Sequence, residues 1–344
     1  MKQNASPPWP LGGSVILAPL SLLYQGAIAA RNLFYDRGWW GRIALPVPVL
    51  SIGNLSLGGS GKTPLVLETV ELLRGAGRRP AVVSRGYGRS SRGVLALEPD
   101  QPAAADLLGD EPAMLQQRGV PVAVGRDRVA AAKLAIERLG CDVLILDDGF
   151  QHRRLGRAAD LVVLDASLSP SVQHLLPRGI LREGWPALAR ADAVVLTRTQ
   201  MATDLAEWES HLQRYARDRP CFLTRHQVAG LRSLEADSPP PPGSAVVLLS
   251  GIARPDLFER DVRALGYRIE SHLAYRDHHP FTTKQLAQAA ALARRVSGHL
   301  VTTEKDLTRI PDRALRDCRP LLLQIREVLE RPQEYLDFLL ARIA

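Results

Sequence analysis

Short apolar runs of strand length recur along the chain from residue 46 onward, and each ends in polar or glycine residues. Six of them are VPVLSIG, RPAVVSRG, VPVAVGR, CDVLILDD, ADLVVLDA and ADAVVLTR. Apolar and polar residues do not alternate within these runs, which is typical of strands that are covered on both faces in a parallel sheet. Helical patterns lie between several runs, as at 63–77 and 126–140, and each ends near a glycine. Strands that alternate with helices predict a doubly wound α/β domain.

The composition changes at DSPPPPGS, residues 237–244, because consecutive prolines fit neither a helix nor the interior of a sheet. Beyond this stretch the pattern reads strand, helix, strand and helix, followed by the strands GHLVTTEKD and RPLLLQI. We therefore predict a main α/β domain over 46–236 and a second, smaller α/β domain over 237–344. The residues before them form a separate hydrophobic segment over 1–45.

A glycine-rich stretch, GGSGKTP at 58–64, lies between the first strand run and the first helical pattern. Such a loop can turn its backbone N–H groups inward around the phosphates of a nucleotide, and the helix start adds partial positive charge. Lys62 would reach the β- and γ-phosphates, and Thr63 would place its hydroxyl on Mg²⁺. The first glycine of the usual P-loop pattern is replaced by Ser56, and the alternative interpretation is a tight turn that contains a lysine. The residues expected to bind the nucleotide are Gly58, Gly59, Ser60, Gly61, Lys62 and Thr63.

Two acidic residues, Asp147 and Asp148, end the apolar run VLIL. Ligands of open α/β sheets bind at the carboxyl ends of the strands. We therefore expect these carboxylates to face the phosphate loop and, together with Thr63, to hold Mg²⁺. The alternative is that they cap a helix or a turn, which is common for aspartate after a strand.

Charge and cysteine content narrow the class of partner. The formal net charge is +8, which suits an anionic partner, and only five of the 44 basic residues are lysines, so that Lys62 and Lys305 stand out. Aromatic residues make up 5% of the chain and do not interleave with a basic run, so we expect no nucleic-acid partner. Three distant cysteines form neither a disulfide framework nor a metal-binding pair, which favours a reducing compartment.

The N-terminal segment contains no charged residue from Gln3 to Ala30 and includes LGGSVILAPLSLLYQGAIAA at 11–30. Four interpretations are open: a signal peptide, a membrane-spanning helix, a helix that lies in the membrane interface, and a buried helix. We favour interfacial attachment, because a domain that uses a nucleotide should remain in the cytoplasm. The residues that would anchor the helix at the interface are Tyr24, Trp39 and Trp40, with Arg31, Arg37 and Arg42 at the headgroups.

The sequence resembles one known family, the tetraacyldisaccharide 4'-kinases of lipid A biosynthesis. The resemblance is carried by SIGNLSLGGSGKTP, VSRGYGR, GDEPAML, VAVGRDR, LDDGFQHRRL, LREG, SGIARPDLF, DHHPF and TTEKD, in this order from residue 51 to about 306. It implies transfer of the γ-phosphate of ATP to the 4'-hydroxyl of a tetraacylated glucosamine disaccharide 1-phosphate, with Mg²⁺. It also implies a P-loop kinase domain over 46–236 with an active-site cleft closed by the smaller domain, and attachment to the cytoplasmic face of the inner membrane. No obligate protein partner is expected.

The resemblance also assigns roles to individual residues. Asp110 matches the catalytic base and His278 the histidine that supports it across the cleft, while Lys62 assists transfer. From the residues alone, Asp110 could equally be a helix-dipole partner, and His278 could belong to a surface turn before Pro280. The residues implied to contact the substrate or its phosphates are Arg85, Tyr87, Arg128, Gln151, His152, Arg182 and Glu183.

Two other classes of function compete with the kinase. A P-loop GTPase switch or metallochaperone normally reads guanine with an N-K-x-D loop, which the strand end LTRT at 196–199 lacks. A membrane adaptor with a vestigial nucleotide site is disfavoured by the intact lysine, threonine and paired aspartates. A comparison of ATP binding with GTP binding would distinguish the kinase from the GTPase. Phosphate transfer to a lipid disaccharide would distinguish the kinase from the adaptor.

Overall fold

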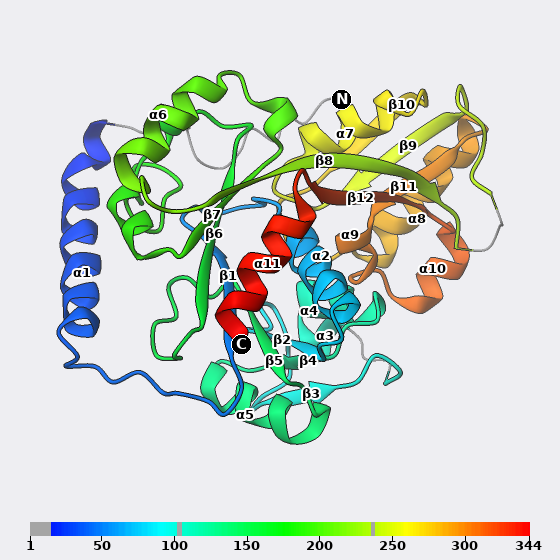
Figure 1. Cartoon of the computed structure of the whole chain (residues 1–344). Coiled ribbons are helices and arrows are strands. Elements are labelled where there is room, and N and C mark those ends of the chain that lie inside the picture. Colours follow the sequence, from blue (N-terminus) through cyan, green and yellow to red (C-terminus); the bar gives the residue numbers. More distant parts are fainter. Residues whose placement is uncertain (1–14, 102–104, 235–237) are drawn as a thin grey trace.

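The computed structural model describes residues 15–101, 105–234 and 238–344, in which 12 strands form one continuous sheet (Figure 1). The strands are β1 (Val49–Asn54), β2 (Pro80–Ser84), β3 (Leu95–Leu97), β4 (Val122–Val124), β5 (Val143–Asp147), β6 (Ala159–Asp165), β7 (Ala193–Thr197), β8 (Cys221–Arg232), β9 (Ala245–Ser250), β10 (Arg268–Ala274), β11 (His299–Thr303) and β12 (Leu321–Leu329). The helices are α1 (Ala18–Asp36), α2 (Lys62–Gly75), α3 (Ala105–Leu108), α4 (Asp110–Gln117), α5 (Arg128–Leu139), α6 (Leu205–Tyr215), α7 (Pro255–Ala264), α8 (Thr283–Arg295), α9 (Glu304–Leu307), α10 (Asp312–Cys318) and α11 (Pro332–Ile343).

The strand order is β10-β9-β11-β12-β8-β7-β6-β1-β5-β2-β4-β3. Neighbouring strands are parallel except at two places, where β8 pairs with β12 and where β3 pairs with β4. The predicted α/β fold with a mostly parallel sheet is therefore confirmed, and each of the six apolar runs is a strand. Strand β1 lies between β5 and β6, so the loop after β1 and the acids after β5 leave the same edge of the sheet.

Helices cover both faces of the first half of the sheet, because alternate residues of each buried strand point to opposite sides. Leu50 and Ile145 face the cluster that α2 and α4 cover, whereas Val49 and Leu144 face α5. Burial of both faces explains why these strands are continuously apolar. Asp127 accepts hydrogen bonds from the first turn of α5, which fixes where that helix begins.

Helix α11, the last element, returns to the first half of the molecule and packs beside α2 (Figure 1). Its Tyr335, Leu339 and Ile343 are buried in the same cluster as the β1 and α2 side chains. The hydroxyl groups of Tyr335 and Thr69 lie 2.8 Å apart within this cluster. No sequence pattern described above predicts this helix or its place.

The two halves of the sheet meet at the long strands β8 and β12. A buried ion cluster lies here: His226 on β8 contacts Asp261 on α7 at 2.7 Å and Glu327 on β12 at 3.4 Å. The Glu327 carboxylate also approaches the phosphate loop, since a Cβ on Gly61 would lie 3.3 Å from its oxygen. The division into domains at residue 237 stays a prediction, because the sheet is continuous and α11 crosses back over it.

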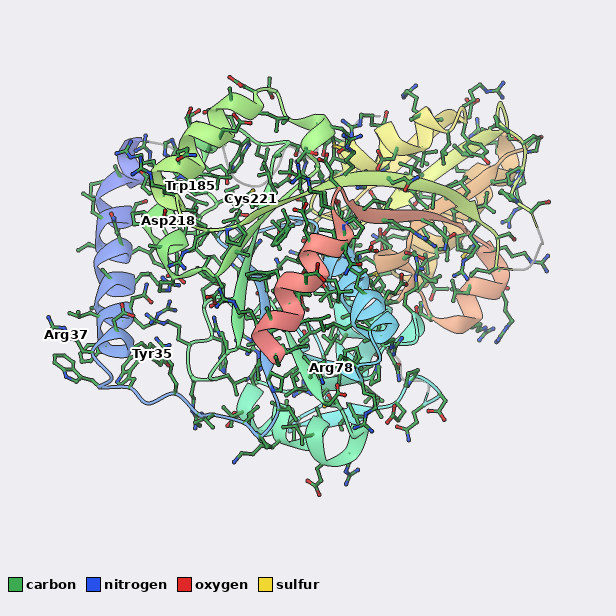
Figure 2. All side chains as sticks on the ribbon, in the orientation of Figure 1. Tyr35, Arg37, Arg78, Trp185, Asp218 and Cys221 are labelled. Carbon is green, nitrogen blue, oxygen red and sulfur yellow. The ribbon has the colours of Figure 1, made fainter. Side chains whose placement is uncertain are left out.

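Helix α1 stands at the edge of the molecule (Figure 1), and polar side chains attach it to the rest of the protein. Its Ser21 and Tyr24 hydroxyls donate to the carbonyl oxygens of Leu175 and Arg182, at 3.2 and 2.9 Å. Tyr35 and Arg37 lie at its C-terminal end, at the margin of the protein (Figure 2). The described residues contain no helix with the length and apolar character needed to cross a membrane. The first 14 residues, which include Gln3 and the start of the predicted apolar segment, lie outside the described residues.

Candidate active site

The glycine-rich loop after β1 is held by hydrogen bonds from its base. Asn54 Nδ2 donates to Ser60 Oγ at 2.9 Å, and Thr197 Oγ1 donates to the Ser60 carbonyl at 2.9 Å. Arg198 donates to the Gly59 carbonyl at 2.8 Å. Gly61 has φ +82°, a left-handed conformation that favours glycine, and α2 begins at the next residue. The loop is therefore a fixed cradle at a helix N-terminus, which is the arrangement that binds phosphate.

The two predicted carboxylates lie beside this loop. Asp148 Oδ1 is 3.5 Å from Lys62 Nζ, and Arg182 donates to both oxygens of Asp148 at 2.7 and 2.8 Å. Asp147 is buried, and its Oδ2 accepts a hydrogen bond from Ser84 Oγ at 3.2 Å. Its Oδ1 is buried without a hydrogen-bond partner among the described residues. An unpartnered buried carboxylate oxygen beside a phosphate loop fits a site for Mg²⁺.

The environment drives the pKa values of these two acids apart. Burial raises the pKa of Asp147 to about 7, and the nearby charges of Glu111 and Asp148 add to this effect. Burial also opposes ionisation of Asp148, but Lys62 and Arg182 outweigh it and hold its pKa below its usual range. Asp148 therefore stays charged, whereas at Asp147 the positive charge of Lys62 does not outweigh burial and the two neighbouring acids.

A second pair of predicted residues meets across the two halves of the chain. His278 Nδ1 lies 2.8 Å from Asp110 Oδ2, although the residues are 168 positions apart. Asp110 is the first residue of α4, and His278 lies in the turn after β10 with φ +59°. Arg309 Nε approaches the same Asp110 oxygen at 3.4 Å. The start of α4 is also close to the paired acids, because the charge of Glu111, the residue after Asp110, raises the pKa of Asp147.

A close backbone approach places Tyr87 beside this pair. A Cβ on Gly109 would lie 2.5 Å from the Tyr87 carbonyl oxygen, so only glycine permits the loop at 85–89 to pack on the start of α4. The ring of Tyr87 then lies 5.1 Å from the ring of His278, measured between centroids. Tyr87 is 64% exposed, so most of its surface remains available to a ligand.

Three other predicted contact residues carry polar atoms that are available to a ligand. Within the described part of the chain, Arg128 Nε, Gln151 Oε1 and His152 Nε2 are buried without hydrogen-bond partners. Burial lowers the pKa of His152 to about 4, and the positive charge of Arg128 adds to this, so the imidazole is neutral. Arg85 is exposed and acts electrostatically on Arg128. These atoms can bind a polar ligand, and their roles stay predictions.

Glu183 differs from the other predicted contact residues in its surroundings. Its carboxylate is buried and accepts hydrogen bonds from Arg31 at 3.1 Å, Asn32 at 2.9 Å and Arg190 at 3.1 Å. These contacts attach α1 to the segment that carries Arg182. The structure thus places Glu183 between α1 and the site, with its oxygens already engaged.

Two cationic residues, Lys305 and Arg309, lie beside the Asp110–His278 pair, and no sequence pattern predicts a role for either. Arg309 contacts Asp110 as described, and Lys305 Nζ lies 3.2 Å from both Asp277 Oδ1 and His278 Nε2. TTEKD marked the region of Lys305, but the sequence offers no sign that this turn faces α4.

The parallel sheet and the phosphate loop at the N-terminus of α2 define the class of protein: a P-loop NTPase-like α/β fold. The family model described as Tetraacyldisaccharide-1-P 4'-kinase matches residues 13–344, and the chain belongs to this family. Relatives named tetraacyldisaccharide 4'-kinase include one from Anaeromyxobacter sp. (strain Fw109-5), 40% identical over 337 residues, which cover 94% of this chain and 91% of the relative.

A second relative of the same name, from Bdellovibrio bacteriovorus, is 36% identical over 301 residues, which cover 86% of this chain and 88% of that protein. Among solved structures, the chain is similar to LpxK from Aquifex aeolicus in complex with ATP. The identity is 28% and the TM-score 0.75, and the match covers 96% of this chain and 99% of that one.

Proposed function

We propose that the protein transfers the γ-phosphate of ATP to the 4'-hydroxyl of a tetraacyldisaccharide 1-phosphate. Membership of the family and the similarity to an LpxK structure with bound ATP support this reaction. The alternative of a GTPase switch or metallochaperone has less support, since the relatives that cover most of the chain carry the kinase name.

The loop at 58–63 would hold the phosphates of ATP through its backbone N–H groups, with Lys62 on the β- and γ-phosphates. Thr63, Asp147 and Asp148 would hold Mg²⁺, and the buried, unpartnered Oδ1 of Asp147 supports this assignment. When bound, Mg²⁺ neutralises the charge that develops on the phosphates. Arg182 keeps Asp148 charged and in place.

The pairing of Asp110 with His278 at 2.8 Å is the observation that carries the proposal. Asp110 acts as the base: it takes the proton of the sugar hydroxyl as that oxygen bonds to the γ-phosphorus and the bond to ADP breaks. The products are ADP, the 4'-phosphorylated lipid, and a proton held by Asp110 until it leaves to solvent. His278 orients the carboxylate from the opposite half of the chain.

The outer side of α1 provides a membrane-facing surface. Its large apolar side chains point outward: Leu22 is 68% and Leu23 72% exposed, and Trp39 beyond the helix is 63% exposed. A helix of a globular protein normally turns its apolar side inward, so this reversed orientation supports attachment in the membrane interface. We infer that α1 docks on the cytoplasmic face of the inner membrane, where the acyl chains of the substrate remain in the bilayer. Extracting them would cost about 0.8 kcal/mol for each CH₂ exposed to water.

The polar side of α1 connects this surface to the active site. Tyr24 donates to the carbonyl of Arg182, and Arg31 and Asn32 bind the adjacent Glu183. Arg182 in turn holds Asp148. One residue, Arg182, thus connects α1 to the proposed Mg²⁺ ligand Asp148, which suits an acceptor that is reached from the bilayer.

The test is phosphate transfer from labelled ATP to a lipid disaccharide in detergent micelles, with Asp110→Asn as the variant. The amide keeps the shape of the carboxylate but cannot take the hydroxyl proton, so we expect kcat to fall by about 10²–10⁴. ATP affinity, measured by thermal shift with Mg²⁺, should equal that of the parent. Normal turnover in Asp110→Asn would remove Asp110 as the base, and absence of transfer by the parent protein would overturn the function.

A further inference from the structure

We infer that Lys305 is a positioning residue that fixes the tautomer of His278, so that the imidazole donates its Nδ1 hydrogen to Asp110. The inference rests on the proposed function only for its effect on turnover. Its structural basis is the contact of Lys305 Nζ with His278 Nε2 at 3.2 Å, on the far side of the ring from Asp110.

The hydrogen-bond chemistry of the contact allows one tautomer. An ammonium group has three N–H donors and no lone pair, so it can only donate. His278 Nε2 must therefore carry a lone pair, and the single proton of the neutral ring lies on Nδ1. Nδ1 lies 2.8 Å from Asp110 Oδ2, so this N–H donates a hydrogen bond to the carboxylate.

Lys305 is held in position by its own neighbours. Its Nζ also donates to Asp277 Oδ1 at 3.2 Å and lies 3.7 Å from Glu111 Oε1. Burial disfavours the lysine charge, but Glu111 and Asp277 outweigh it and raise the pKa of Lys305, so the ammonium persists. The next residue, Asp306, accepts the Gly251 N–H at 3.0 Å and anchors the turn.

The tautomer determines where the transferred proton can go. With Nδ1 already protonated and Nε2 blocked by a cation, His278 cannot accept a proton from Asp110. The hydroxyl proton therefore stays on Asp110 during transfer, and His278 serves to orient the carboxylate. Without Lys305, either ring nitrogen could carry the proton, and the ring could also become doubly protonated. The charged or titratable groups that face this ring are Asp110, Asp277 and Lys305, with Tyr87 against its side. Glu111 lies next to Lys305, and Arg309 lies next to Asp110.

The direct test is long-range ¹H–¹⁵N NMR of the full-length protein labelled with ¹⁵N-histidine, with the His278 signals identified by their loss in His278→Ala. We expect the parent to show the Nδ1–H tautomer. Lys305→Met should shift the signals toward the Nε2–H or doubly protonated form. Lys305→Arg should retain the parent tautomer, because arginine is also a pure donor. A parent protein with the Nε2–H tautomer, or unchanged signals in Lys305→Met, would overturn the inference.

Kinetics give a second readout. In Lys305→Met we expect kcat to fall about tenfold or more, since one hydrogen bond to a charged group is lost, with KM for ATP unchanged. The acid limb of the kcat–pH profile should move to higher pH, and Lys305→Arg should restore part of the rate. Lys284→Met, an exposed lysine of α8, is the matched control and should behave as the parent. Wild-type kcat and pH profile in Lys305→Met would exclude the positioning role. If the parent protein transfers no phosphate, the proposed function fails, while the NMR result still decides the tautomer.

Discussion

Replacing Asp147 by asparagine should make the protein more stable while abolishing its proposed activity. Asp147 is buried at the end of β5, its Oδ1 has no hydrogen-bond partner within the described residues, and its pKa is raised to about 7. A carboxyl with a raised pKa stabilises the fold only while it is protonated. The folded state loses this stability as the pH rises from the ordinary value of 3.8 through about 7.

The size of the effect follows from the pKa. Holding this charge in the buried site costs on the order of 4 kcal/mol above pH 7, since each pKa unit corresponds to about 1.4 kcal/mol. The asparagine removes that cost but buries an NH₂ group that needs a partner, which costs about 1–3 kcal/mol. We therefore expect Asp147→Asn to raise the free energy of unfolding by about 1–3 kcal/mol at pH 8. The advantage should shrink toward pH 4, where the parent is protonated.

The assay is urea denaturation of parent and variant without Mg²⁺, across this pH range. Buried acids that do not interact with Asp147 contribute equally to both proteins and cancel in the difference, whereas the contributions of Glu111 and Asp148 change together with Asp147. Asp148→Asn is the matched control and should instead destabilise, because it leaves Lys62 and Arg182 without their shared partner. With Mg²⁺ and a non-hydrolysable ATP analogue, the parent should gain stability and Asp147→Asn should gain much less. Equal pH dependence in the parent and Asp147→Asn would refute the argument that burial perturbs this carboxyl.

Two further predictions concern other parts of the molecule. The double variant Leu22→Glu/Leu23→Glu should release the protein from anionic vesicles in a sedimentation assay. The control Leu205→Glu, at an exposed site on α6, should remain bound, and equal release of both variants would argue against α1 as the anchor. Burial disfavours the charge of His226, but Asp261 and Glu327 outweigh this effect and raise the pKa of His226 to about 9. The charged imidazole therefore stabilises the fold fully below pH 6.5, and this stability is lost as the pH rises through about 9. His226→Gln should therefore flatten the decline of stability over that alkaline range, and a decline as steep as that of the parent would show that His226 is not the titrating group.

The parallel strands were predictable because burial on both faces leaves an apolar run that no other element of that length produces. Strand β8 was not, because it pairs antiparallel to β12 and alternates buried with exposed positions. Phe222, Thr224 and His226 point inward, while Arg225 and Gln227 point out. A search for continuous apolar runs passes over such a strand.

The candidate site also has one part that the sequence predicts and one part that it does not. The phosphate loop and the paired acids are contiguous motifs at strand ends, so their meeting follows from the parallel sheet. The Asp110–His278 contact joins residues far apart in the chain, and nothing local marks either one; only the family resemblance pointed to them. The roles of Lys305 and Arg309 could not be predicted, because they depend on which side of a short turn faces α4.

The position of α11 bears on how the protein is made. This twelve-residue helix is synthesised long after β1 and α2, yet its Tyr335 and Leu339 cover apolar side chains of those two elements. Domains at the N-terminus of a chain usually fold during synthesis. Here the nucleotide-binding half stays uncovered on one face until α11 has been synthesised, so it cannot complete its core before then. Truncation before Pro332 should therefore leave the apolar side chains of α2 and β1 exposed and favour aggregation.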